Sequence, residues 1–155
     1  MVQALNLTAP LKQDAESQQR LQRVLDTFDD SLRQTVEAAL SKSEVVHYAR
    51  FVVIDRKYIQ VLTEFDGDFM QYTEFFRREL GPVFELVFSL AEGAPPWEEL
   101  DNPNSFAEYA GSLNLPSIGT ASGATEGQGY LYSAVGDATV REIKACLGSR
   151  EPSAP

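Results

Sequence analysis

Cysteine and histidine are almost absent from this chain of 155 residues, since each occurs once, as Cys146 and His47. A single cysteine cannot form an internal disulfide, so the composition is typical of a reducing compartment, and we expect a cytoplasmic location. One cysteine and one histidine are also too few for an ordinary transition-metal site. We therefore expect neither a metal nor a cofactor.

Basic residues and long apolar runs are scarce as well. Thirteen Lys and Arg residues stand against 23 Asp and Glu residues, which gives a net charge of −10. Such a surface repels a phosphate backbone, so a nucleic-acid partner is not expected. The longest apolar stretch is interrupted by Glu85, well before the roughly 20 residues that a membrane span needs. We expect no membrane partner either.

The apolar residues that are present predict an ordered series of strands and helices. Alternation indicates a strand, steps of three and four residues indicate a helix, and glycine or proline ends either element. The predicted strands cover 4–8, 45–54, 58–65 and 130–135, and the predicted helices cover 13–40, 69–80, 83–90, a short stretch after Pro103, and a C-terminal stretch from Thr139.

This order predicts the ferredoxin-like βαββαβ fold, an α+β domain with an antiparallel sheet, helices on one face and extra short helices. We expect one domain over residues 1–148, a mobile glycine-rich loop at 119–129 and a disordered tail at 149–155. The second face of such a sheet is left open. Self-association would cover it, so a homodimer is expected.

Three segments resemble a known family: VVHYARFVVID at 45–55, TEFDGDFMQYTEFF at 63–76 and YLYSAVGDATVREI at 130–143. They are similar to segments of an uncharacterised bacterial group in the dimeric α+β barrel superfamily, and Phe65-Asp66-Gly67 matches a motif before the second helix of that group. The group is akin in architecture to dye-decolorizing peroxidases and antibiotic-biosynthesis monooxygenases. The resemblance implies two ferredoxin-like sheets that close around a cavity.

The same resemblance limits the chemistry. The haem enzymes of the superfamily use a proximal histidine in a later part of a longer chain, and this sequence has none at the corresponding place. The loop at 119–129 is an insertion relative to the group. The superfamily includes oxygenases, dismutases, isomerases, cyclases and ligand-binding proteins, so its fold alone selects no reaction.

One candidate catalytic pair follows from the hairpin at 45–65. A turn at Arg56-Lys57 would place Asp55 opposite Tyr58 and His47 opposite Asp66. A carboxylate beside an imidazole is a usual arrangement for a general base. The alternative is a histidine at a strand end that is hydrogen-bonded to the backbone or to water.

Further candidate ligand-binding residues are Arg50, Glu64, Tyr48, Tyr130 and Tyr132. Arg50 lies within an apolar strand, so we expect it to be buried with a carboxylate partner or to hold an anionic group of a ligand. Glu64 shares the predicted face of His47. The tyrosines could direct their hydroxyl groups into a cavity, or simply pack.

Three functional hypotheses remain open from the sequence. The first is a cavity that binds a small, apolar organic molecule, with an oxygenase, isomerase or cyclase reaction that needs no cofactor. The second is a non-catalytic dimer with a ligand-binding or structural role. The third and weakest is a haem-dependent, peroxidase-like enzyme.

Overall fold

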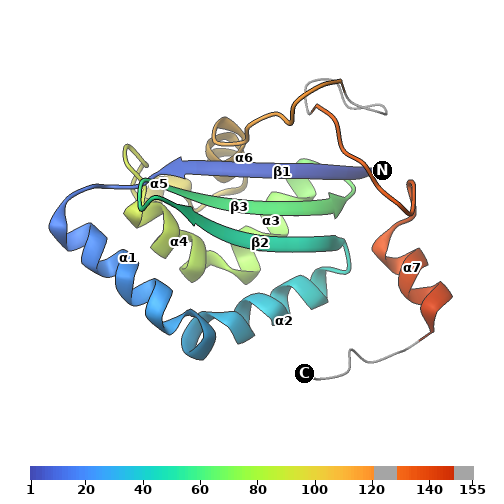
Figure 1. The fold of residues 1–155 in the computed structure, drawn as a ribbon, viewed down its shortest axis with the longest axis horizontal. Helices are drawn as coiled ribbons and strands as arrows, with labels where there is room; N and C mark the ends of the chain where they lie inside the picture. The colour runs from blue at the N-terminus through green and yellow to red at the C-terminus, as the bar shows by residue number, and fades with distance from the viewer. Residues whose placement is uncertain (121–128, 149–155) are drawn as a thin grey trace.

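The computed structural model describes residues 1–120 and 129–148, and shows an α+β chain built on a three-stranded antiparallel sheet in the order β1-β3-β2 (Figure 1). The predicted tail at 149–155 and most of the predicted mobile loop lie outside these ranges. The elements are β1 (Val2–Pro10), α1 (Ala15–Thr27), a π-helical turn (Phe28–Leu32), α2 (Arg33–Ser43), β2 (Val46–Ile54), β3 (Tyr58–Asp66), α3 (Phe69–Glu79), α4 (Gly81–Leu90), α5 (Trp97–Leu100), α6 (Pro103–Ser112) and α7 (Val140–Leu147).

Short polar side chains define where several helices begin. Asp14 accepts a hydrogen bond from the Ser17 N–H at the start of α1, and Asp68 does the same for Gln71 at the start of α3. Thr139 forms the predicted capping box with Glu142 at α7. Among residues 1–120 and 129–148, no helix is long and apolar enough to cross a membrane.

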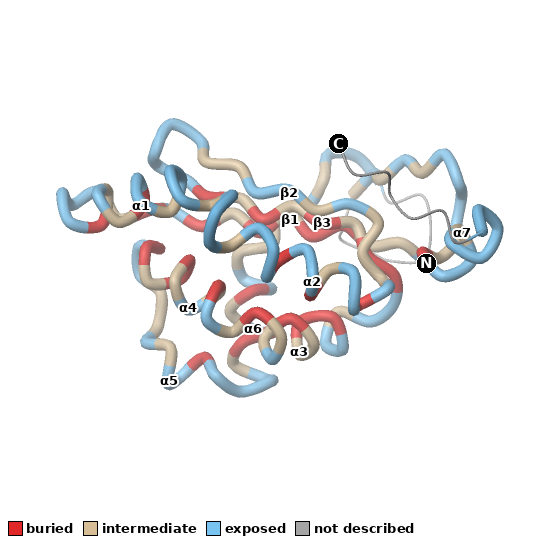
Figure 2. The backbone as a smooth tube through the Cα atoms, turned by 90° about the horizontal axis from the view of Figure 1, so that it is seen from below, coloured by how far each residue is buried: buried red, intermediate tan, exposed pale blue. Residues whose placement is uncertain are grey.

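The helices lie mainly on one side of the sheet. In Figure 1, α3, α4, α5 and α6 lie behind the strands, and α1 and α2 run along the outer strand β2. Along β3, Ile59, Val61, Thr63 and Phe65 are buried against this helical side. The tube in Figure 2 shows the same concentration of buried backbone between the strands and α3, α4 and α6. The opposite sheet face, with Tyr48 and Tyr58, is open to solvent.

The β2–β3 hairpin forms as predicted, but the predicted register is wrong by one residue. Ile54, not Asp55, lies opposite Tyr58, because the turn contains three residues rather than two. Asp55 and Arg56 both have positive φ, and the Lys57 N–H donates to the Ile54 carbonyl at 2.9 Å. Aspartate tolerates this left-handed conformation better than most residues with a β-carbon.

The predicted strand at 130–135 does not form, so the fourth strand of a βαββαβ fold is missing from the described residues. Its expected place is the free edge of β1, which other residues occupy. The Thr8 N–H donates to the Leu113 carbonyl at 2.9 Å, and the Leu115 N–H donates to the Asn6 carbonyl at 3.1 Å. A strand-like sequence without a partner edge remains irregular, since β propensity depends strongly on context.

Candidate functional site

His47 and Asp66 do come together, at the end of the sheet where β2 begins. His47 Nε2 lies 2.8 Å from Asp66 Oδ1, and the two side chains are only 10% and 8% exposed. The pairing of β2 with β3 shifts between Val46 and Tyr48, which is a bulge at His47. Beyond the bulge the pairing lies two residues from the predicted register, so Val45 and not His47 lies opposite Asp66. The contact therefore exists because the bulge redirects the His47 side chain, and not through the register that the sequence predicts.

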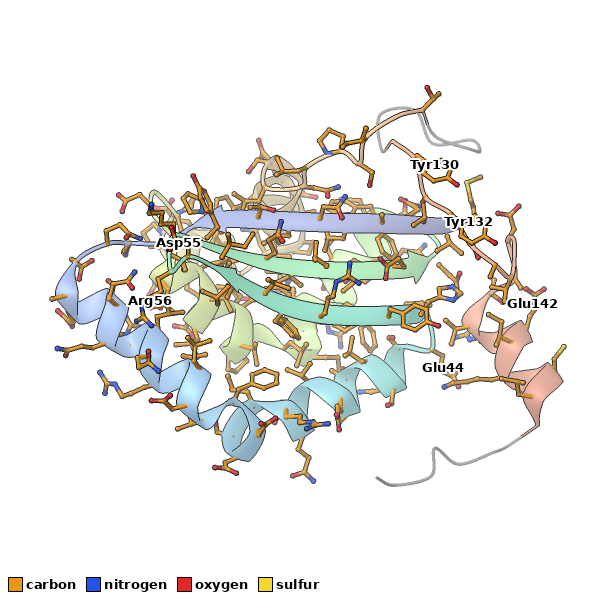
Figure 3. All side chains as sticks on the ribbon, in the orientation of Figure 1. Glu44, Asp55, Arg56, Tyr130, Tyr132 and Glu142 are labelled. Carbon is orange, nitrogen blue, oxygen red and sulfur yellow. The ribbon has the colours of Figure 1, made fainter. Side chains whose placement is uncertain are left out.

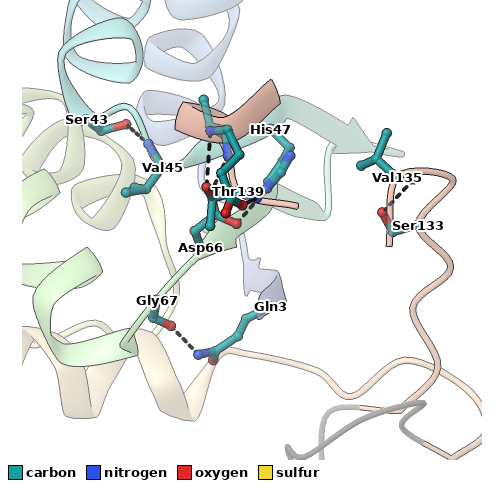
Figure 4. A network of polar contacts seen from close by, with 11 residues as sticks. Gln3, Ser43, Val45, His47, Asp66, Gly67, Ser133, Val135 and Thr139 are labelled. Atoms are coloured by element: carbon teal, nitrogen blue, oxygen red, sulfur yellow. Dashed lines mark hydrogen bonds and ion pairs between the residues drawn. The ribbon is translucent and has the colours of Figure 1, made fainter. Parts of the chain in front are cut away.

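The second oxygen of Asp66 is also engaged. Asp66 Oδ2 accepts a hydrogen bond of 2.7 Å from the backbone N–H of Val140, the first residue of α7 (Figure 4). A carboxylate at this position satisfies a free helix N–H and interacts favourably with the positive end of the helix. Arg141 adds an ion pair to Glu44 at 3.3 Å. Together these contacts attach α7 to the sheet.

A different feature offers room for a ligand: a pocket of about 480 Å³ beneath the bend between α1 and α2. The outer strand β2 and helix α4 form its other walls. Most of the lining side chains are aliphatic. The lining residues are Leu21, Val24, Leu25, Phe28, Asp29, Leu32, Arg33, Val36, Glu37, Leu40, Ala49, Arg50, Phe51, Val53, Ile59, Val83, Leu86, Val87 and Leu90.

The π-helical turn at Phe28–Leu32 gives this pocket its roof. The sequence predicts one helix over 13–40, and the structure interrupts it where the π-turn joins α1 to α2. Such a turn is a common cause of helix kinks, and π-turns occur often at functional sites. The rings of Phe28 and Phe51 lie 5.9 Å apart, centroid to centroid, and join the bend to β2.

The charged residues that line the pocket from the helices are all solvent-exposed, so they mark its opening. Arg33 Nε lies 2.9 Å from Glu37 Oε1, and Arg33 Nη1 lies 3.3 Å from Asp29 Oδ1. These hydrogen bonds, first to Glu37 and then to Asp29, raise the pKa of Arg33 above its ordinary value. The guanidinium thus joins two carboxylates, and these three side chains together carry one net negative charge.

Arg50 is not where the sequence places it. The prediction of a buried arginine is wrong, because Arg50 is exposed and, in the described part of the chain, makes no hydrogen bond or ion pair. It lies opposite Leu62, so its side chain belongs to the open sheet face. Arg50 borders the pocket because three consecutive residues of the outer strand line it.

Tyr48 and Glu64 lie opposite each other on the open face. Tyr48 is 74% exposed, so its hydroxyl does not point into an enclosed cavity. Glu64 Oε2 is buried and has no hydrogen-bond partner among the described residues. The open face therefore carries an unsatisfied acceptor beside an exposed aromatic ring.

Tyr130 and Tyr132 do not line the pocket beneath the bend, so their predicted role in a cavity stays a prediction. They are 53% and 73% exposed. Figure 3 shows both side chains beside the end of the sheet, on the segment that leads to α7. Because no strand forms there, the expectation that both side chains point to the same side of a strand does not apply.

The described residues contain no group of three or more His, Cys, Asp or Glu side chains that could hold a metal ion. Comparisons of the chain with models of protein families, with curated proteins and with solved structures gave no match. The resemblance to the dimeric α+β barrel superfamily therefore stays a prediction.

Sequence reasoning did not find the pocket. A continuous helix over 13–40 would lack the bend whose residues Phe28, Asp29 and Leu32 line the pocket. One signal is present in the sequence: Phe28, Leu32, Val36 and Leu40 recur at steps of four residues only, without the steps of three that usually alternate with them.

Proposed function

We propose that this protein binds a small, largely apolar organic molecule in the pocket between α1–α2, β2 and α4. The observation that carries the proposal is the aliphatic lining of a space of about 480 Å³. Known ligand pockets fall in the range of roughly 300–1,000 Å³ and are lined mainly by apolar side chains.

The positions of His47 and Asp66 favour a binding role over acid–base catalysis. Neither residue lines this pocket, although Asp66 lines a separate space of about 480 Å³ beside α3 and α7. Both carboxylate oxygens of Asp66 are already engaged, one by His47 and one by the N–H of Val140. In such a pair the imidazole of His47 would be the base and Asp66 would orient it, and His47 lies outside the pocket in which we propose that the ligand binds. The attachment of α7 is enough to explain why His47 and Asp66 lie together.

The experiment that tests the proposal measures binding of N-phenyl-1-naphthylamine, an uncharged probe whose emission rises in apolar surroundings. Ala49→Phe places a ring in the pocket from β2, where aromatic residues are well tolerated. Val52→Phe on the opposite face of the same strand is the matched control. We expect emission to rise with the wild-type protein and with Val52→Phe, and to be lost with Ala49→Phe.

Unfolding by urea separates a filled pocket from a damaged fold, because Ala49→Phe should keep or slightly raise the free energy of unfolding. Equal probe binding by a folded Ala49→Phe variant would place the probe elsewhere. Failure of the wild-type protein to bind the probe would refute the proposal.

A second candidate function is a homodimer formed through the open sheet face. It is supported by the exposed side chains of Tyr48, Ile54 and Tyr58 and by the unsatisfied oxygen of Glu64, which a donor from a second copy could reach. Sedimentation equilibrium tests it. A dimer that Tyr48→Asp converts to a folded monomer supports this interface, and a wild-type monomer at all concentrations refutes it.

A further inference from the structure

The buried part of the pocket is apolar, and its charged side chains lie at the solvent-exposed opening. Every lining side chain that is buried is apolar, including Leu21, Val36 and Ile59. The charged side chains of Asp29, Arg33 and Glu37 are 78%, 56% and 62% exposed, respectively. A molecule that fits this arrangement has an aliphatic body, with any polar group at the end that lies nearest the solvent.

The sign of the charge at the opening determines which polar group a bound ligand can place there. Arg33 already binds both carboxylates, so its donors are largely engaged, and the three side chains together carry one net negative charge. The whole chain, with a net charge of −10, adds a field of the same sign. A cationic group is attracted to this opening, and an anionic group is repelled.

Other groups near the opening also bear on this preference. Arg20 and Arg23 line an adjoining pocket that shares Val24, Leu32 and Leu86 with this one, and Arg20 donates to Ser89 Oγ at 2.7 Å. As the outer strand, β2 has peptide groups that do not pair with β3, and they provide both N–H donors and carbonyl acceptors. They can therefore bind an amine or a carboxylate and do not discriminate. Arg50 could attract an anion, but its position opposite Leu62 directs its side chain to the other face of the sheet.

Building on the proposed binding function, we infer that the ligand is an aliphatic molecule with a cationic end, of the alkyl amine class. The chain occupies the pocket beneath the π-turn. The ammonium group lies at the opening, within reach of Asp29 and Glu37.

The test compares three ligands of equal chain length, decylamine, decanol and decanoate, as competitors of N-phenyl-1-naphthylamine at pH 7. We expect decylamine to displace the probe at a concentration roughly five-fold lower than decanoate, with decanol between them, because exposed ion pairs contribute modest energies. Rising salt should reduce this ratio by screening the charges.

Two variants with the same change in net charge locate the effect. Asp29→Asn combined with Glu37→Gln leaves Arg33 as the charge at the opening, and should reverse the preference toward decanoate. Glu92→Gln combined with Glu108→Gln changes two exposed residues that do not line the pocket, and should keep the preference for decylamine.

The outcomes separate this inference from the function on which it rests. If the probe binds but decanoate competes as well as decylamine, the inference is wrong and the binding function stands. If decanoate competes better and Arg50→Gln removes that advantage, Arg50 binds an anionic ligand and the inference is wrong. If no ligand and no probe binds, both proposals fail.

Discussion

The helices behind the sheet and the helices along β2 both present apolar side chains to the strands, but they pack differently. Behind the sheet, α4, α5 and α6 are joined by aromatic rings: Phe106 contacts Phe84 and Phe88, with centroids 5.1 and 5.9 Å apart. Along β2, the bent α1–α2 region also presents a row of apolar side chains, yet it leaves a pocket beneath it. The pocket therefore reflects helix geometry and not a shortage of apolar residues.

The largest expected loss of stability is in the aromatic region behind the sheet, and it tests whether this region is better packed than the α1–α2 region. Phe106 is 2% exposed, so Phe106→Ala should lower the free energy of unfolding by about 3–5 kcal/mol. Leu25, in the wall of the pocket, is 43% exposed, and Leu25→Ala should cost less than about 1 kcal/mol. Urea unfolding of both variants measures the difference. Equal losses would contradict the comparison.

An intermediate effect is expected at high pH, from a buried phenol on the well-packed side. Burial raises the pKa of Tyr72 to about 12, although its hydrogen bond to Thr63 acts in the opposite direction. The unfolded chain loses this proton near pH 10, and the folded chain holds it until about pH 12. Stability is thus full below pH 10 and falls between those values, by an amount on the order of 2 kcal/mol.

Urea unfolding at a series of pH values measures this decline. Tyr72→Phe should remove the part of the decline that belongs to this residue, although it leaves the Thr63 hydroxyl without a partner and lowers stability at neutral pH by about 1 kcal/mol. An unchanged decline in the Tyr72→Phe protein would show that other groups cause it.

The smallest effect concerns α7, which belongs to neither region and depends on a few polar contacts. Asp66→Asn removes the negative charge from the side chain that accepts a hydrogen bond from the Val140 N–H. Amide protons of residues 140–147 should then exchange about ten-fold faster, which corresponds to the lower end of the range for hydrogen bonds to charged groups. Hydrogen-exchange mass spectrometry measures this rate, with α6 as an internal control. Faster exchange throughout the protein would instead make Asp66 a residue of the core.

Most of the elements were predictable because their signals are local. Asp14, Asp68 and Thr139 each cap a helix whose start the sequence indicates within a few residues. Gly81 and Pro82 separate α3 from α4 as expected. These features depend on neighbours along the chain, and not on the tertiary structure.

The errors have two sources, the conformation of the hairpin turn and contacts between residues far apart in the sequence. The length of the turn at Asp55–Lys57 depends on two left-handed residues, and a difference of one residue exchanges the faces of a strand. The segment at 130–135 has the composition of a strand but no free edge to join, because Leu113 and Leu115 bind β1. The candidate pair of His47 and Asp66 was predicted, whereas the bulge that brings the two side chains together was not.

The π-turn affects the direction in which the apolar side chains at steps of four residues point. In an α-helix each step of four residues overshoots a full turn by about 40°, so a row with that spacing winds gradually around the helix. A π-turn contains more residues per turn and rotates the row back, so Phe28, Leu32, Val36 and Leu40 all line one pocket. Deleting one residue of α1 between Leu21 and Phe28 would rotate the preceding part of the helix by about 100° relative to the π-turn and turn Leu21 toward solvent. The shape of the pocket is thus encoded in the number of residues in this helical region as much as in their chemical nature.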